Sequence, residues 1–243
     1  MKALILSAGL GTRLRPLTNK VPKVMIKVGG KPILWYHVQL LKKYGIKDIW
    51  INLHHLPDVI TNYFGDGSKF GVKISYSYEK ELLGTSGALR NPASGIEEAF
   101  RKGTFIVAYG DILPNFNYKR LIDFHIKRKS IWTEGTHSSP EPWTKGVIDT
   151  DQSGRIIKFV EKGPKKELVS DQVRAGVIVC DPKIIDYIPE GFSDFGLDLA
   201  PKILKLGLPM YAIDTKAYSK DIGTIDRLRK ARADFRAGRF KFG

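Results

Sequence analysis

Apolar and polar positions along the first 130 residues alternate between patterns typical of strands and of helices. Short apolar runs bounded by Gly, Pro or polar residues predict buried strands, and apolar positions three or four residues apart predict helices. We expect strands over 3–6, 49–53, 72–78 and 104–108, and helices over 32–44, 58–64, 87–100 and 117–129. Pro32 suits the first turn of its helix and Gly45 its end, whereas Pro92 should break the helix over 87–100.

This alternation of strands and helices predicts the fold class. Crossover helices of this length imply an α/β fold with a parallel sheet. Such open sheets bind ligands beyond the carboxyl ends of their strands. The segments 9–13 and 110–111 each follow a predicted strand, so we expect both at that edge of the sheet.

Beyond residue 130 the pattern becomes rich in β structure. Apolar runs over 147–149, 155–160 and 173–180 predict strands, and an amphipathic helix is expected over 225–237. The chain contains no internal repeat, low-complexity tract or linker. We therefore expect a single domain over 1–243, with an α/β half over 1–130 and a β-rich half over 131–243.

Composition narrows the class of protein. Apolar residues make up 42% of the chain and charged residues 27%, the balance of a globular domain rather than a disordered one. No apolar run is long enough for a membrane span or a secretory signal, which predicts a cytoplasmic protein. The single cysteine, Cys180, excludes an internal disulfide and a multi-cysteine zinc site.

The formal net charge of +15 predicts an anionic partner, and its distribution indicates which kind. Residues 1–31 hold seven Lys and Arg and no Asp or Glu, interleaved with Gly and Pro rather than placed on a helix. This arrangement favours a small polyanionic ligand. A nucleic-acid partner is an alternative, but the basic residues lack the interleaved aromatic residues of a known RNA motif.

The residues after the first predicted strand suit a phosphate chain. Gly9 and Gly11 let the backbone approach a ligand and direct N–H groups at it. The segment is not a Walker loop, and a Rossmann fingerprint is incomplete because its third glycine and later acidic residue are missing. Arg13 and Lys23 add cations with no acidic residue nearby, and arginine can bind two phosphate oxygens at once.

The run from Leu6 to Met25 resembles the opening signature of the sugar-phosphate nucleotidyltransferases, also called nucleotide-sugar pyrophosphorylases. Further segments resemble later motifs of that family in the same order: 79–89 the base-binding motif, 109–111 the metal-binding turn, 159–162 the sugar-phosphate motif, and 175–177 and 220–224 the last two. The resemblance implies a Rossmann-like, mixed and mainly parallel sheet flanked by helices. Since the chain stops at Gly243, we expect it without the C-terminal left-handed β-helix of longer relatives.

The resemblance also implies a reaction and its residues. An oxygen of a sugar 1-phosphate attacks the α-phosphorus of a nucleoside triphosphate, and pyrophosphate leaves. Catalytic roles fall to Arg13 at the leaving pyrophosphate, Lys23 at the α-phosphate and Asp111, and Mg²⁺ is held by Asp111 and Asp221. The nucleotide is assigned to Leu6, Ala8, Gly9, Gly11, Thr12, Arg13, Glu81, Gly84 and Thr85. The sugar phosphate is assigned to Gly146, Glu161, Lys162, Arg174 and Gly176.

The residues within these motifs indicate which nucleotide and which sugar the protein uses. The segment 81–88 resembles members that use GTP with mannose or manno-heptose 1-phosphate, with uridylyl, cytidylyl and thymidylyl transfer to another phosphate acceptor as alternatives. Arg174 stands where Asn is usual, which suggests an acceptor with an additional anionic group. A non-catalytic regulatory subunit is the remaining alternative, although Arg13, Lys23 and both aspartates are present. We expect no nucleic-acid or membrane partner, and the sequence leaves a homo-oligomer open.

Overall fold

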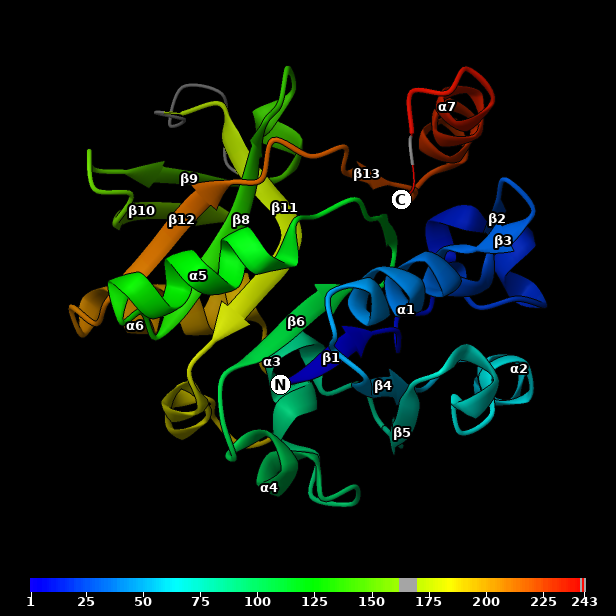
Figure 1. The fold of residues 1–243 in the computed structure, drawn as a ribbon, viewed down its shortest axis with the longest axis horizontal. Helices are drawn as coiled ribbons and strands as arrows, with labels where there is room; N and C mark the ends of the chain where they lie inside the picture. The colour runs from blue at the N-terminus through cyan, green and yellow to red at the C-terminus, as the bar shows by residue number, and fades with distance from the viewer. Residues whose placement is uncertain (162–169, 241, 243) are drawn as a thin grey trace. The chain divides into compact units, whose positions relative to one another are not determined.

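The computed structural model describes residues 1–161, 170–240 and 242, which form two compact units (Figure 1). Unit 1 consists of the described residues of 1–82, 108–116 and 218–243, and unit 2 of those of 83–107 and 117–217. Each unit combines segments that are distant in the sequence. The units therefore divide the chain differently from the halves 1–130 and 131–243, because residues 218–243 join the N-terminal segment.

Unit 1 is built on parallel strands. Strand β1 (Lys2–Leu6) pairs in parallel with β4 (Asp48–Leu53), and β4 pairs in parallel with β5 (Lys73–Tyr78). Helix α1 (Ile33–Lys43) leads into β4, and helix α2 (Pro57–Phe64) connects β4 to β5. Most residues of β1 and β4 are buried, whereas β5 is exposed at both ends. On α1 the side chains of Leu34, Val38 and Leu41, spaced three or four residues apart, have no exposed surface.

The end of the chain completes unit 1. Helix α7 (Ile225–Arg236) places Leu228 and Ala231 in an apolar cluster with residues of the N-terminal segment, among them Leu14, Val28, Ile33 and Tyr36. The Phe235 ring lies against Gly29, where a Cβ atom would come within 2.0 Å of it. Only glycine fits this contact, and its φ of 58° also favours glycine. Two short strands, β7 (Ile112–Leu113) and β13 (Lys220–Asp221), pair antiparallel in the same unit.

Unit 2 contains a mixed sheet. Strand β11 (Gln172–Cys180) pairs antiparallel with β8 (Trp132–Ser138), β8 pairs in parallel with β12 (Met210–Asp214), and β9 (Gly146–Thr150) pairs antiparallel with β10 (Ile156–Glu161). Helix α5 (Tyr118–Arg128) packs on β8, where the His125 Nδ1 and Thr133 Oγ1 atoms are 3.0 Å apart. Helix α6 (Ala200–Lys205) precedes β12. Strand β6 (Phe105–Tyr109) carries the chain from unit 2 back into unit 1.

The helix predicted over 87–100 is broken near Pro92 as expected, but less of the segment is helical than predicted. The chain forms α3 (Gly84–Gly87), a 3-10 turn over Ala88–Arg90 and α4 (Ile96–Phe100) instead. Pro92 removes a backbone donor, and Gly95 has a φ of 69°, so a continuous helix is excluded between them.

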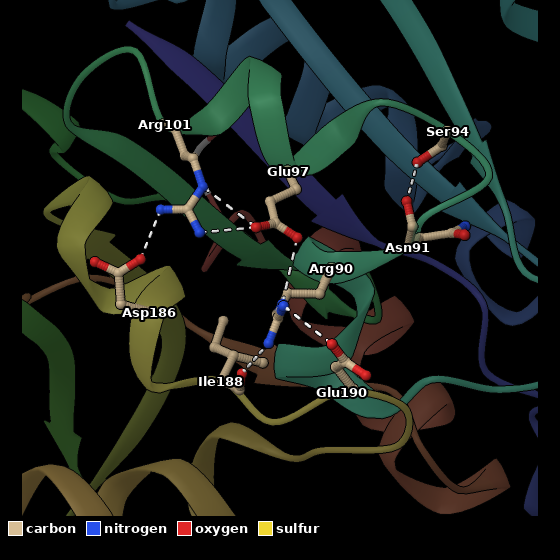
Figure 2. Close-up of polar contacts among 8 residues, drawn as sticks. All are labelled: Arg90, Asn91, Ser94, Glu97, Arg101, Asp186, Ile188 and Glu190. Atoms are coloured by element: carbon tan, nitrogen blue, oxygen red, sulfur yellow. Dashed lines mark hydrogen bonds and ion pairs between the residues drawn. The ribbon is translucent and has the colours of Figure 1, made fainter.

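Ion pairs hold these short pieces together (Figure 2). The Glu97 carboxylate accepts from Arg90 at 3.3 Å and from Arg101 at 2.7 Å. Arg101 also reaches Asp186 at 2.7 Å, and Arg90 donates to the Ile188 carbonyl at 2.7 Å. The network therefore attaches α4 to the segment over 186–190.

The remaining predicted elements are confirmed with shifts of one or two residues at their ends. The apolar pattern did not single out β8, which polar residues interrupt, or β12, whose apolar run is short. None of the helices in the described part of the chain is long and apolar enough to span a membrane.

Candidate functional site

The loop after β1 is shaped by close backbone contacts in unit 1. Gly11 has a φ of 62°, and a Cβ atom there would lie 2.9 Å from the Thr18 side chain and 3.2 Å from Lys23 Cβ. The Thr18 hydroxyl donates to the Gly11 carbonyl at 2.9 Å. Glycine thus lets the loop pass directly beside Lys23. Of the residues predicted to bind the triphosphate, Ala8 is buried, Leu6 and Gly11 are half-buried, and Gly9, Thr12 and Arg13 are exposed.

Asn52, a residue that the sequence analysis missed, supports this loop. The Asn52 side chain, 2% exposed, accepts from the Ser7 backbone N–H at 2.6 Å and donates to the Glu79 carboxylate at 2.7 Å. Asn52 lies near the end of β4, next to β1 in the sheet. A polar residue inside an apolar strand was the available signal, because a buried amide must find hydrogen-bond partners.

Lys23 joins the two predicted metal ligands. Its ammonium group donates to the Asp111 carboxylate and lies 3.5 Å from Asp221 Oδ1. The pairing of β7 with β13 sets Asp221 opposite Ile112, and the Ile222 N–H donates to the Asp111 carbonyl at 3.3 Å. The ladder therefore brings the two aspartates to one cation, although 110 positions separate them in the chain.

The Asp111 turn also lies beside the glycine loop. The Gly110 N–H donates to the Leu6 carbonyl at 3.0 Å, and a Cβ atom at Gly110 would be 2.7 Å from that oxygen. The segments 9–13 and 110–111 follow β1 and β6, and both lie at the carboxyl end of β1, as the parallel-sheet argument predicts.

Asp221 has a second cationic partner, Arg227, which the sequence analysis did not single out. The Arg227 guanidinium donates to Asp221 Oδ2, and the Gly223 N–H donates to Asp221 Oδ1 at 2.6 Å. Burial opposes the charged carboxylate, but the charges of Lys23 and Arg227 outweigh it and hold the pKa of Asp221 below its usual value. Asp221 is therefore an oriented anion at neutral pH.

The donor set formed by Asp111 and Asp221 fits Mg²⁺. The two carboxylates converge on one positive charge, and carboxylate oxygens are ligands that Mg²⁺ prefers. Among the described residues no group of three or more His, Cys, Asp or Glu side chains forms a metal site. Two protein carboxylates are nevertheless enough, because Mg²⁺ usually completes its shell with water and substrate oxygens.

The predicted base-binding residues belong to different units. Glu81 is exposed after β5 in unit 1, whereas Gly84 and Thr85 lie in unit 2 against the segment over 193–195. The Thr85 hydroxyl donates to Asp194 at 2.7 Å and accepts from the Phe195 N–H at 2.9 Å. The Ser86 and Gly87 N–H groups both donate to the Ser193 carbonyl at 3.0 Å. These two donors at the start of α3 are therefore already hydrogen-bonded within the protein.

The predicted sugar-binding residues Glu161 and Arg174 form a buried cluster with Glu134 in unit 2. Arg174 Nε lies 3.3 Å from Glu134 Oε1, and Arg174 Nη1 lies 3.4 Å from Glu161 Oε2. The Trp132 indole N–H donates to Glu134 at 3.1 Å. Burial raises the pKa of Glu134 to about 6, against the lowering effects of Arg174 and Trp132. Glu134 was missed because a single acid in a strand gives no sequence signal of its partners.

Two glycines close this cluster. A Cβ atom at Gly146 would lie 2.7 Å from Glu161 Oε2, and one at Gly196 would lie 2.3 Å from the same oxygen. Gly146 therefore makes room for the Glu161 carboxylate, and its assignment to the sugar phosphate stays a prediction. Gly176 has a φ of 86° at an irregularity of the β11–β8 ladder. Lys162 lies outside the described residues.

A family model described as nucleotidyl transferase matches residues 2–238. A UTP–glucose-1-phosphate uridylyltransferase of Synechocystis is 37% identical, covering 93% of this chain and 61% of that protein. A mannose-1-phosphate guanylyltransferase of Mycobacterium tuberculosis is 32% identical, covering 97% and 65%. The chain thus spans about three fifths of the length of these curated relatives.

Solved structures resemble the whole chain. A structure described as a candidate glucose-1-phosphate thymidylyltransferase from Bacillus anthracis has a TM-score of 0.85 at 27% identity, covering 100% of this chain and 97% of that one. HddC from Yersinia pseudotuberculosis, complexed with GMP-PN, has a TM-score of 0.79 at 29% identity, covering 96% and 99%. The first of these structures is named as a thymidylyltransferase, whereas the second contains the guanine nucleotide analogue GMP-PN.

Proposed function

This chain belongs to the nucleotidyl transferase family, and we propose that it joins a nucleoside triphosphate to a sugar 1-phosphate with release of pyrophosphate. The observation that carries the proposal is the cluster of Lys23, Asp111 and Asp221 beside the glycine loop of unit 1. It combines backbone donors, a cation and two carboxylates where a phosphate chain can lie, which suits phosphoryl chemistry.

The reaction is an in-line displacement at the α-phosphorus. An oxygen of the acceptor phosphate forms a bond to that phosphorus, the bond to the bridging oxygen of the β-phosphate breaks, and pyrophosphate leaves. The protein positions two anions and neutralises the charge that develops between them. In this proposal the backbone of 8–12 holds the triphosphate, Arg13 the leaving oxygens and Lys23 the α-phosphate.

Asp111 and Asp221 would hold Mg²⁺. When bound, the ion neutralises phosphate charge and fixes the geometry of the triphosphate. Lys23 already contacts both carboxylates, so it is held in place for the α-phosphate without a separate support.

For the remaining substrate contacts we propose the following residues. Glu81 and the backbone of Gly84 and Thr85 bind the base, and Glu161 binds sugar hydroxyls with Lys162 on the sugar phosphate. The two units together then serve as one nucleotidyltransferase domain over 1–243.

The finer proposal is transfer from GTP to mannose or manno-heptose 1-phosphate. It rests on the amino-acid sequence of the segment 81–88. It also rests on similarity to a relative whose name specifies mannose 1-phosphate and to a structure that contains GMP-PN. Transfer from UTP to glucose 1-phosphate is the second candidate, because the uridylyltransferase relative has the higher identity of 37%.

The test is Mg²⁺-dependent release of pyrophosphate by the purified protein. GTP, UTP, CTP, dTTP and ATP are each paired with mannose, heptose, glucose and N-acetylglucosamine 1-phosphates. We expect turnover with one preferred pair and a loss of about 100- to 1000-fold in Asp111→Asn. Asp123→Asn is the matched control, since Asp123 is exposed on α5 and pairs only with Lys119 among the described residues. If no pair supports turnover in folded protein, the proposed reaction is wrong.

A further inference from the structure

Strand β4 lies between β1 and β5 in unit 1, and the three strands run parallel. Their carboxyl ends therefore meet at one edge of the sheet. The chain leaves β1 into the glycine loop over 7–13 and leaves β5 into the segment over 79–82. The end of the middle strand adjoins both, so a side chain there can contact the proposed triphosphate site and part of the proposed base site at once.

Asn52 occupies this position and bonds to both neighbours. Its side-chain oxygen accepts from the Ser7 N–H at 2.6 Å, and its side-chain nitrogen donates to the Glu79 carboxylate at 2.7 Å. The three residues are only 2%, 4% and 5% exposed, so both hydrogen bonds are shielded from water. The two partners also fix the orientation of the amide, because an N–H group requires an acceptor and a carboxylate requires a donor.

The two histidines that follow β4 reinforce this link. The His54 ring donates through Nδ1 to the Glu79 carbonyl at 2.8 Å. On the other side, the His55 ring donates through Nε2 to the Thr18 carbonyl at 2.8 Å, and the Thr18 hydroxyl in turn donates to the glycine loop. The segment over 52–55 is therefore hydrogen-bonded on one side to residues that follow β1 and on the other side to Glu79.

We propose that Asn52 is a positioning residue that holds the glycine loop and the segment over 79–82 in one fixed register, so that the triphosphate and the base of a nucleotide bind together. The proposal rests on the proposed function, which places the triphosphate at the glycine loop and the base at Glu81. Two sites at the correct separation bind a linked ligand more tightly, because the second contact forms at a high effective concentration. Loss of the register therefore weakens binding of the whole nucleotide more than binding of a bare triphosphate.

The test measures two dissociation constants by calorimetry in the presence of Mg²⁺. One is that of inorganic tripolyphosphate, and the other is that of the tightest-binding member of GTP, UTP, CTP, dTTP and ATP. Their ratio reports how much the attached nucleoside improves binding. Asn52→Asp keeps an acceptor for the Ser7 N–H but sets a second carboxylate against Glu79, which breaks the link. We expect the ratio to fall about 10- to 100-fold.

Turnover supplies a second readout that separates positioning from a loss of stability. In Asn52→Asp the KM for the nucleotide should rise, whereas the KM for the sugar 1-phosphate should stay within about threefold of the wild-type value. A variant that was only less stable would lose kcat without a change in either KM, because fewer molecules would be folded.

A control and a compensating variant make the comparison specific. Asn62→Asp is the matched control, since it makes the same exchange at an exposed position of α2 in the same unit, and it should leave the ratio unchanged. Asn52→Asp combined with Glu79→Gln exchanges the acid and the amide, which places a donor opposite an acceptor again, so most of the lost ratio should return. Glu79 takes part in further interactions, so Glu79→Gln is also measured alone.

An unchanged ratio in folded Asn52→Asp overturns the proposal. A double variant whose ratio is no higher than that of Asn52→Asp also overturns it, as does a wild-type ratio close to one. If Asn52→Asp does not fold, Asn52→Ser takes its place, because serine is uncharged and too short to reach Glu79, and the same fall of the ratio is expected.

Failure of this inference is distinguishable from failure of the proposed function, because the ratio is measured by binding and not by catalysis. If the wild type binds a nucleotide but no acceptor yields pyrophosphate, the proposed function fails and the ratio still decides the role of Asn52. If pyrophosphate is released but the ratio does not respond to Asn52→Asp, only the inference fails.

Discussion

Lys23 shows how one side chain organises the proposed catalytic group. Its ammonium contacts Asp111 and Asp221 with only 11% of the side chain exposed, and Gly11 allows the loop to pass next to it. Asp221 is oriented in turn by Arg227 and by the Gly223 N–H. Groups that orient a metal-binding carboxylate in this way often matter nearly as much as the carboxylate itself.

Arg227→Met tests this orientation at the level of a single residue. We expect activity to fall by about 10- to 100-fold with little change in thermal stability, because Asp221 loses the partner that directs its second oxygen. Pyrophosphate release at several Mg²⁺ concentrations measures the effect, and a higher Mg²⁺ requirement is expected. Arg229→Met is the matched control on the same helix, since Arg229 is exposed and pairs only with Asp226 among the described residues. Equal activities in the two variants would show that Arg227 has no positioning role.

Some residues of the candidate site could be predicted from the sequence, and others could not. Lys23, Asp111 and Asp221 stand out because each lies in a segment that resembles a family motif: Lys23 follows Pro22, Asp111 follows Gly110, and Asp221 comes two residues before Gly223. Asn52, Glu134 and Arg227 do not, because the partners of Asn52 and Glu134 lie 27 to 45 positions away and Arg227 reaches Asp221 only from a turn of helix α7.

At the scale of elements, the short helix α3 depends on the segment over 191–195. The Ser193 carbonyl accepts from two N–H groups of α3, and the Ser193 N–H donates to the Leu83 carbonyl at 2.9 Å. A Cβ atom at Gly84 would lie 2.3 Å from the Ser193 carbonyl oxygen. A four-residue helix has too few internal hydrogen bonds to be stable alone, so this docking maintains it.

Comparison of Gly84→Ala with Gly95→Ala distinguishes the loss of stability caused by a close contact from the loss caused by backbone strain. Both glycines have positive φ, 77° and 69°, at the start of a short helix of unit 2, but only Gly84 faces other backbone. We expect Gly95→Ala to cost about 1–2 kcal/mol from strain alone. Gly84→Ala should cost about 1–3 kcal/mol more because the added methyl group must displace Ser193. Urea unfolding measures both changes, and equal losses would contradict the tight docking of α3.

The apolar pattern located elements better than it located their breaks. Strands β1 and β4 are mainly apolar runs with little exposed surface, and the pattern predicted them well, together with β5, whose two ends are exposed. Helix α3 lies outside any apolar period, and the 87–100 region ends and restarts through Pro92, Gly95 and ion pairs with distant residues. Such contacts leave no local pattern.

On the scale of the whole molecule, the stability of the fold should depend on buried histidines. His37 in α1 has no exposed surface, and burial lowers its pKa to about 4 although the Ile112 carbonyl accepts a hydrogen bond from its ring at 2.8 Å. His125 and His137 have pKa values lowered to about 4 for the same reason. The unfolded chain, with a histidine pKa near 6.5, binds more protons between pH 6.5 and 4 than the folded protein does.

The free energy of unfolding should therefore fall as the pH is lowered through this window. His37 alone should remove about 2 kcal/mol between pH 6.5 and 5. Glu134, whose pKa is raised to about 6, acts in the opposite sense and offsets part of the loss. Urea unfolding at both pH values, in the wild type and in His37→Gln, measures the contribution of His37. Identical pH dependence of the two proteins would show that His37 does not titrate in this way.

The family match confirms the resemblance to the sugar-phosphate nucleotidyltransferases, and the structure confirms a mixed, mainly parallel sheet flanked by helices. Both follow from local features that a sequence carries directly. Parallel strands need continuous apolar runs, crossovers need amphipathic helices, and a phosphate loop needs glycine and cations at short spacing.

Only the tertiary structure decided which charges meet. The sequence by itself determined that Arg174 replaces the usual residue at its position, and this suggested an anionic acceptor. The strands of unit 2 set Glu134 and Glu161 against its guanidinium, so Arg174 is already paired with two carboxylates of the protein. Likewise the β7–β13 ladder, and not any motif, brings Asp221 to Asp111 and Lys23. Electrostatic interactions depend on distance and burial, and both are properties of the folded chain.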